Sequence, residues 1–133
     1  MSMKDYLFLV SGILSLSAQA TQVCSSAKTN SGETYFFAFQ RGQLTAICVR
    51  NDKSPELSNL DICGQEMFVL TNSSNMNGAS NQVYQTLSGA QVKVSGRSSN
   101  AAEITVGRQL TSQSVSGKRT VVVQAGTYQV TCK

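Results

Sequence analysis

Short runs of β-branched and aromatic residues recur along this chain and constrain its fold more than any other feature. They are separated by glycine-containing or polar segments, which are typical of turns between the strands of an antiparallel sheet. Two pairs of runs flank Arg41-Gly42 and Ala125-Gly126, so each pair is expected to form a hairpin. The pattern predicts a mainly β fold, an antiparallel barrel or sandwich of about seven strands. The runs are residues 34–40, 43–50, 66–71, 91–95, 102–106, 119–124 and 127–132.

Residues 80–88 allow two interpretations. A helix over this segment would start after a serine N-cap and stop at a glycine, with Val83, Tyr84 and Leu87 on one face. A strand would instead separate Tyr84 from the other two residues. We therefore expect either one short helix near residues 80–88 or an irregular strand. The polar stretch at residues 72–81 is expected to be a loop.

Residues 1–20 have the pattern of a secretory signal peptide. Lys4 precedes an apolar stretch at residues 6–16, and Ala18-Gln19-Ala20 offers small residues at the cleavage positions. The apolar stretch is too short to span a bilayer and no later run is longer, so no membrane span is expected. A buried N-terminal helix is the alternative. We expect cleavage after Ala20, which leaves residues 21–133 as a single secreted, extracellular domain.

The four cysteines are expected to form covalent cross-links. An even number of cysteines in an exported chain of this size indicates two disulfides. A zinc site is the competing interpretation, but the chain has no histidine and no C-x-x-C pair. We therefore expect no metal and no cofactor. The cysteines are Cys24, Cys48, Cys63 and Cys132.

Charge and composition argue against nucleic-acid binding and catalysis. The net charge is +4, but the basic residues are scattered, whereas nucleic-acid binders cluster them among aromatic residues. Without histidine or a G-x-S-x-G motif, the usual catalytic base and nucleophile are missing. Two carboxylates could in principle flank a glycosidic bond, as in a glycosidase. The acidic residues around Pro55, however, lie in a polar segment, where acids are normally solvated. We expect no nucleic-acid partner, no catalytic residues and no enzyme activity.

The aromatic run at residues 35–39 is expected to supply residues to both the core and the surface. Strand alternation places Tyr35, Phe37 and Phe39 on one face, where they are expected to form the core. Phe36 points the other way and is a candidate contact for a partner protein or a flat ligand.

The polar segment at residues 51–61 supplies further candidate partner contacts, namely Asp52, Lys53 and Glu56. The same segment would be the inserted loop if the protein inhibited a secreted enzyme. Asn72-Ser73-Ser74 matches a glycosylation acceptor, a pattern with meaning only in a eukaryotic protein.

Residues 37–48 (FAFQRGQLTAIC), Cys63-Gly64 and Phe68-Val69 resemble the Alternaria major-allergen family of fungal secreted β-barrels. The similar features are a Gly-x-Leu hairpin, a cysteine after it, a later Cys-Gly pair and a phenylalanine that opens a strand. The resemblance implies a disulfide between Cys48 and Cys63, which leaves Cys24 to pair with Cys132. It also implies a compact barrel that can form a homodimer.

Members of that family act as allergens or as elicitors of plant defence, and the resemblance implies binding of host proteins or small flavonoid-like ligands without catalysis. We therefore predict a secreted, non-enzymatic interaction protein of the effector or elicitor type, with a virulence or defence-related role. The alternatives are a glycan-binding barrel, such as the receptor-binding subunit of a toxin, and an inhibitor of a secreted enzyme.

Overall fold

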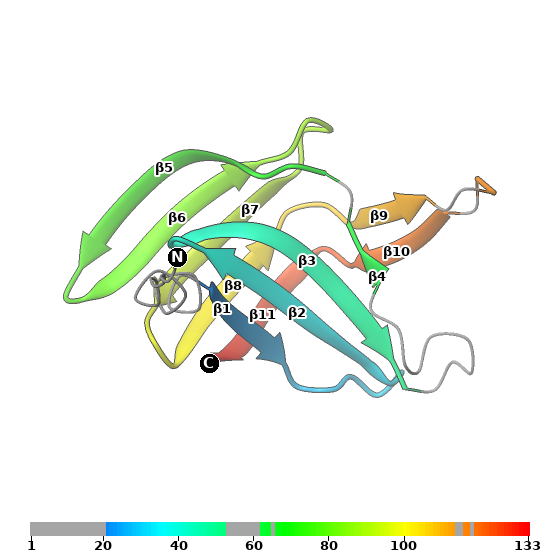
Figure 1. Ribbon diagram of the computed structural model, residues 1–133, viewed down its shortest axis with the longest axis horizontal. Helices are drawn as coiled ribbons and strands as arrows, with labels where there is room; N and C mark the ends of the chain where they lie inside the picture. The colour runs from blue at the N-terminus through cyan, green and yellow to red at the C-terminus, as the bar shows by residue number, and fades with distance from the viewer. Residues whose placement is uncertain (1–20, 53–61, 65, 114–115, 118) are drawn as a thin grey trace, which may run out of the picture.

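The computed structural model describes residues 21–52, 62–64, 66–113, 116–117 and 119–133 (Figure 1). Within these ranges the chain forms strands and turns and contains no helix. The strands are β1 (Thr21–Ser26), β2 (Glu33–Gln40), β3 (Gln43–Asn51), β4 (Ile62–Cys63), β5 (Val69–Met76), β6 (Ala79–Gln85), β7 (Gln91–Arg97), β8 (Ala101–Val106), β9 (Leu110–Gln113), β10 (Arg119–Val123) and β11 (Gly126–Cys132).

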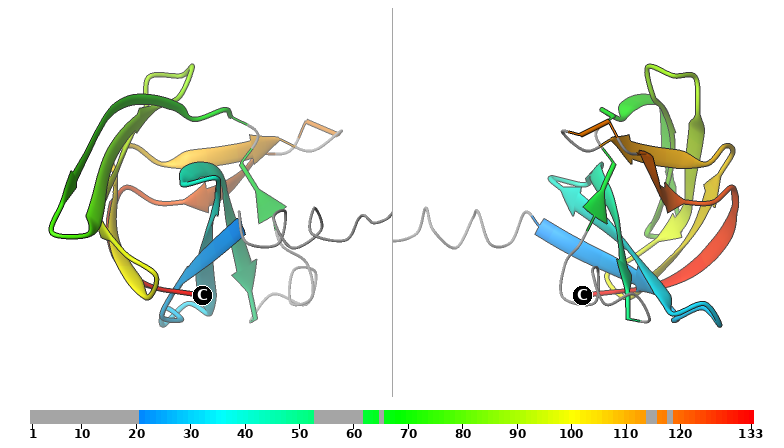
Figure 2. Two further views of the ribbon diagram at one scale, coloured as in Figure 1. Left: turned by 60° about the vertical axis from the view of Figure 1, so that its left-hand side comes forward. Right: turned by 90° about the vertical axis from the view of Figure 1, so that its right-hand side faces the viewer.

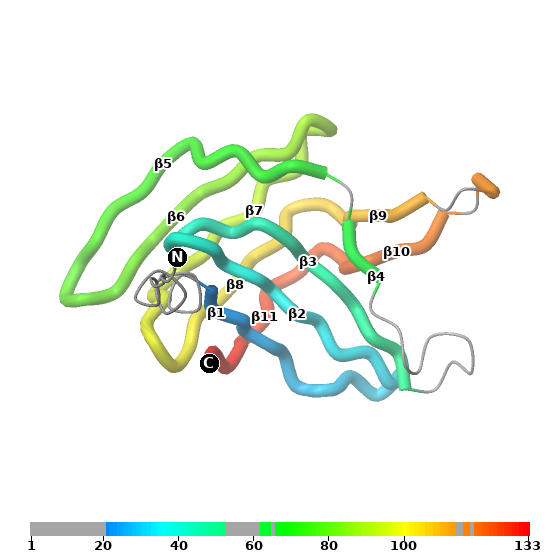
Figure 3. Tube along the Cα trace, viewed as in Figure 1, coloured from blue at the N-terminus to red at the C-terminus, as the bar shows by residue number. Residues whose placement is uncertain are grey.

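Nine of these strands form one antiparallel sheet that curls into a half-barrel (Figures 1 and 2). The order across the sheet is β4-β3-β2-β1-β11-β8-β7-β6-β5, and β9 and β10 form a separate pair. The Cα trace shows the first and last described strands, β1 and β11, side by side (Figure 3). The predicted mainly β antiparallel class is confirmed, with eleven described strands where about seven were expected.

The core lies inside the curl of the sheet. Tyr35, Phe37 and Phe39 on β2 are buried, as their alternation predicted, and truncating a buried ring of this kind costs about 3–5 kcal/mol. Val92 and Val94 of β7 with Ile104 and Val106 of β8 complete the interior. Leu110 of β9 and Val122 of β10 pack onto it. The two-stranded pair therefore shares the core of the half-barrel.

Two disulfides join neighbouring strands at directly opposed positions. Cys24 of β1 pairs with Cys132 of β11, and Cys48 of β3 pairs with Cys63 of β4. This is the connectivity expected above. The first bond lies in the core, whereas Cys63 of the second is exposed on the outer face of the sheet.

Of the two interpretations of residues 80–88, the strand is the one observed, because residues 79–85 form β6. Tyr84 and Gln82 both point inward and are buried, while Leu87 lies beyond the strand and is 88% exposed. The alternation is hard to recognise in the sequence because one of the two inward residues is a glutamine. In the fold, the amide of Gln82 accepts a hydrogen bond from the Tyr84 hydroxyl, so a polar side chain occupies an interior position.

Two turn predictions have opposite outcomes. The hairpin at Arg41-Gly42 is confirmed, with φ of 54° and 78° at the two turn residues. The hairpin at Ala125-Gly126 is wrong, because β10 pairs with β9 while β11 pairs with β1 and β8.

The loop expected at residues 72–81 is also wrong, because β5 and β6 form a hairpin there. Its turn is Asn77-Gly78, whose φ values of 55° and 78° match those of the first hairpin. Positive φ at both central residues is the requirement of a type I′ turn, and Asn-Gly meets it at the lowest steric cost.

A buried set of hydrogen bonds, here called the interior polar network, ties the first hairpin to β6. The Tyr84 hydroxyl accepts the Leu44 backbone N–H (2.9 Å), and Gln82 Nε2 donates to the Gly42 carbonyl (2.9 Å). These residues lie on strands that are not neighbours in the sheet. The network therefore holds the two sides of the curled sheet together across its interior.

Candidate functional site

Strand β5 lies at one end of the sheet and is its most exposed long strand. Among the described residues it has one strand neighbour, β6, so its other backbone edge faces away from the sheet (Figure 1). Its sequence, VLTNSSNM, contains no charged residue and no proline. From Thr71 to Met76 every residue is exposed.

Edge strands in soluble proteins are usually short, charged, interrupted by proline or covered, because their unpaired N–H and C=O groups can pair with another chain. The opposite edge of this sheet fits that rule, since β4 is only two residues long. Strand β5 has eight residues, and its single irregularity is a register shift between Leu70 and Asn72. It therefore presents a long, uncharged edge.

Exposed apolar side chains gather at the same strand. Six large hydrophobic residues are exposed in the described chain, and four of them lie on β5 or beside its ends. Val69 pairs with Gln85 across the hairpin, which brings the segment before β5 next to the segment after β6. The four residues and their exposed fractions are Met67 (71%), Val69 (52%), Met76 (67%) and Leu87 (88%).

Polar contacts order the start of this edge. The backbone N–H of Ser88 donates to Glu66 Oε1 (3.1 Å), and Arg108 Nη1 donates to the Ser88 carbonyl (2.8 Å). The pKa of Glu66 is lowered, chiefly by hydrogen bonding to Ser88 and further by the charge of Arg108. These contacts fix the residues on either side of the exposed Met67 and Leu87.

The same three polar residues line a pocket of about 410 Å³. Two arginines and one carboxylate give its wall a net positive charge. Glu66 Oε1 and Arg108 Nη1 each hold Ser88, so one atom of each charged side chain is used within the protein. The full lining is Glu66, Ser88, Arg108, Gln109, Thr111, Gln113 and Arg119.

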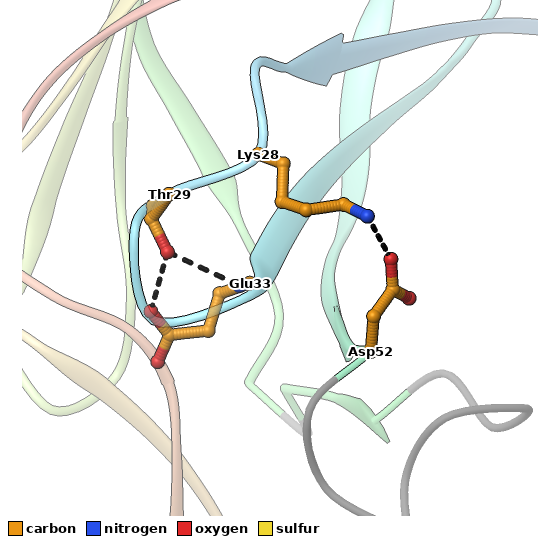
Figure 4. Close-up of polar contacts among 4 residues, drawn as sticks. All are labelled: Lys28, Thr29, Glu33 and Asp52. Carbon is orange, nitrogen blue, oxygen red and sulfur yellow. Dashed lines mark hydrogen bonds and ion pairs between the residues drawn. The ribbon is translucent and has the colours of Figure 1, made fainter.

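Two of the four predicted partner contacts lie in the described structure. Phe36 is half-buried on the outer face of β2, with the Arg50 guanidinium 5.4 Å from its ring centroid. Asp52 is exposed at the end of β3 and forms an ion pair with Lys28 (Figure 4). Lys53 and Glu56 lie outside the described residues.

Asp52 also contacts the turn before β2, because its backbone N–H donates to the Gly32 carbonyl (3.0 Å). Thr29 Oγ1 donates to Glu33 Oε1 (2.9 Å) and accepts the Glu33 backbone N–H (3.1 Å), as Figure 4 shows. The carboxylate of Glu33 and the ring of Tyr128 adjoin Tyr35. The pKa of Tyr35 is raised to about 12, mainly because burial removes the hydroxyl from water. The neighbouring Glu33 and Tyr128 raise it further. Phe36 contacts Arg50, whereas Asp52 pairs with Lys28. The structure therefore places Phe36 and Asp52 in two separate contacts rather than in one cluster.

The described residues contain neither a cluster of metal-ligating side chains nor a membrane-spanning helix. No group of three or more histidine, cysteine, aspartate or glutamate side chains there could hold a metal ion. None of the described residues forms a helix long and apolar enough to cross a membrane.

Comparison with known proteins identifies no relative. No protein-family model matches the chain, and neither a curated protein nor a solved structure matches it.

The sequence interpretation missed the β5 edge for an identifiable reason. The polar composition of residues 72–81 predicts a loop, but their Asn77-Gly78 pair is the strongest short-range signal for a hairpin. That signal could have located β5 and β6. It could not have shown that β5 ends the sheet, because strand order depends on pairings between distant segments.

Proposed function

We propose that this protein is a secreted recognition protein that binds another extracellular protein by β-strand addition at β5. The observation that carries the proposal is the coincidence of a long, uncharged, exposed edge with four exposed apolar side chains. In such recognition, backbone hydrogen bonds to the free edge supply affinity, and side-chain contacts supply specificity.

The occupant we favour is an extended, uncharged segment of a partner protein. About half of the residues in a strand direct their N–H and C=O groups to each side, so the free edge of β5 offers several backbone donors and acceptors. The apolar side chains Met67, Val69 and Leu87 would contact apolar residues at one end of the added strand. The polar Asn and Ser side chains in the rest of β5 carry no charge that would repel it.

Secretion is part of the proposal. The signal-peptide pattern of residues 1–20 and the two disulfides support it, because disulfides persist in oxidising extracellular compartments. A non-enzymatic effector or elicitor role would fit a disulfide-bonded half-barrel that presents a strand edge to a host protein. This role stays a prediction. The inhibitor alternative rests on residues 51–61, most of which lie outside the described structure.

The experiment selects extended peptides from a displayed random library against the oxidised mature protein and measures their affinity for two matched variants. Val69→Lys puts a charge on the edge, whereas Val121→Lys puts the same charge at another exposed valine, on β10. We expect Val69→Lys to weaken binding at least about tenfold, which corresponds to about 1.4 kcal/mol. Val121→Lys should leave it unchanged.

Hydrogen exchange supplies an independent readout. Amides of residues 69–76 that face away from β6 should become protected when the peptide binds. Peptides that bind both variants equally, or binding without protection in β5, would refute strand addition. Concentration-dependent dimerisation that Val69→Lys abolishes would identify a second copy of this chain as the occupant and would overturn the proposed partner.

A further inference from the structure

A separate site lies where β7 ends. Arg97, the last residue of β7, is held from three sides: Nη1 donates to Gln22 Oε1 (2.9 Å), Nη2 donates to the Gly42 carbonyl (3.1 Å), and the guanidinium lies 4.8 Å from the Phe39 ring centroid. Gln22 is itself oriented, because its Nε2 donates to the Ser98 carbonyl (2.9 Å). The position of the guanidinium is therefore fixed in advance.

These partners leave the charge of Arg97 uncompensated. All three are neutral, and within the described chain no carboxylate forms an ion pair with Arg97. A guanidinium carries five N–H groups, and only two donors of Arg97 have an acceptor. Its Nε is buried without a hydrogen-bond partner. A half-buried cation with unused donors is costly unless an anion pairs with it.

The space beside Arg97 is a pocket of about 350 Å³, which lies in the range of pockets that hold small ligands. Two of its lining residues have basic side chains, Arg97 and Lys133, and none has an acidic side chain. Three more carry hydroxyl groups, but that of Ser98 is already bonded to the backbone of residues 100 and 101. The Ser99 hydroxyl donates to Asn100 Oδ1 and can still accept, so Thr21 and Ser99 supply the hydroxyls for a polar ligand. The lining consists of Thr21, Gln22, Phe39, Gly42, Arg97, Ser98, Ser99 and Lys133.

We propose that this pocket binds the carboxylate of a small, hydroxyl-rich acid, with a uronic acid as the representative ligand class. Arginine matches the planar geometry of a carboxylate better than lysine does, because its donors form a rigid fork. Arg97 binds the carboxylate, Lys133, which also lines the pocket, adds attraction, and the hydroxyls of Thr21 and Ser99 contact ligand hydroxyls. The site does not involve β5 and stands apart from the proposed strand addition.

The structure also explains why the site needs this particular fold. Gln22 belongs to β1, Gly42 to the first hairpin turn, and Arg97 to β7. Gly42 is also the acceptor for Gln82 in the interior polar network. The network therefore positions the carbonyl that orients Arg97, which makes Gln82 a positioning residue for the pocket.

The test is an NMR titration of the ¹⁵N-labelled, oxidised mature protein with sodium D-galacturonate and sodium D-glucuronate. D-Galactose and D-glucose serve as the neutral counterparts, and inorganic phosphate serves as the competing anion. We expect saturable shifts of the backbone amides of Gly42, Ser98 and Ser99 with either acid. Neutral sugars and phosphate should bind at least about tenfold more weakly. An oligogalacturonate arm, compared with the free acid, distinguishes a glycan residue from a metabolite as the source.

Variants separate a ligand site from a structural role of Arg97. Arg97→Lys keeps the charge but loses the fork, and affinity should fall at least about tenfold. Lys133→Gln should weaken binding about two- to fivefold. Lys93→Gln removes the same charge from an exposed position on β7 and should leave binding unchanged.

Arg97→Lys could also disturb the Arg41-Gly42 hairpin, so the NMR spectrum of this variant must first show the native dispersion. Lys133→Gln provides a second, milder variant. Equal binding of phosphate and carboxylate would overturn the carboxylate assignment. Equal effects of Lys133→Gln and Lys93→Gln, or no saturable binding by any acid, would overturn the site and leave Arg97 as a structural link between β1, β7 and the first hairpin.

Discussion

The two disulfides are expected to stabilise the fold by different amounts. The bond between Cys24 and Cys132 closes a loop with a sequence separation of 108, whereas the bond between Cys48 and Cys63 closes one of 15. In the chain-entropy model, loops of these lengths contribute about 5 and about 3 kcal/mol. A domain of this size has a net stability of about 5–15 kcal/mol. Removing the Cys24–Cys132 disulfide, which closes the longer loop, should therefore bring the protein close to unfolding.

Burial increases this difference. Cys24 is fully buried and Cys132 nearly so, and alanine at these positions would leave space in the core. Cys63 is exposed and Cys48 is half-buried on the outer face. We expect the pair Cys24→Ala with Cys132→Ala to cost at least about 2 kcal/mol more than the pair Cys48→Ala with Cys63→Ala.

Urea denaturation followed by circular dichroism measures both free energies of unfolding. Reduction of the native protein offers a second assay, since a thiol reductant should reach the exposed Cys63 first and reduce the core disulfide only after local opening. Equal destabilisation by the two double substitutions would refute this argument. So would reduction of the Cys24–Cys132 bond before the other.

Three smaller predictions concern side chains of the fold. Tyr84→Phe leaves the Leu44 N–H without its acceptor and Gln82 without its donor. The free energy of unfolding should therefore fall by about 2–4 kcal/mol. Tyr128→Phe is the control and should lower it by about 1 kcal/mol or less in the same denaturation assay. Tyr35, Tyr84 and Tyr128 all have raised pKa values, that of Tyr35 reaching about 12. The folded state thus holds these protons more tightly, and stability that is complete below pH 10 should be lost as the pH rises toward 12. Residues 21–133 contain only these three tyrosines, so tyrosinate absorbance that appears near pH 10 in the folded mature protein would contradict this. Gly78→Ala should cost about 1 kcal/mol through its positive φ alone, because a Cβ there meets no atom within 4 Å.

The sequence could predict the strands whose side chains alternate and whose turns are local. The β2–β3 hairpin, the buried ring face of β2, and strands β7 and β8 all follow from period-2 burial and from turn residues adjacent in the chain. The outward direction of Phe36 follows from the same alternation. These features depend on a few neighbouring residues and need no knowledge of the remaining fold.

The predictions that failed required long-range pairing. Strand β6 has an inward Gln82 that is acceptable only because Tyr84 and Gly42 hydrogen-bond to it. Strand β11 pairs with β1 and β8 rather than with β10, its neighbour along the chain. Local patterns do not record which of several possible partners a strand will meet.

By itself, the sequence determined a disulfide-bonded, mainly β domain with an aromatic core, because alternation, turn chemistry and cysteine content act locally or through composition. Only the tertiary structure decided that β5 ends the sheet and that Arg97 meets Gln22 and Gly42. Those last contacts join residues 75 and 55 positions apart. Their formation depends on how far the whole sheet curls, which is a property of all the strand pairings together.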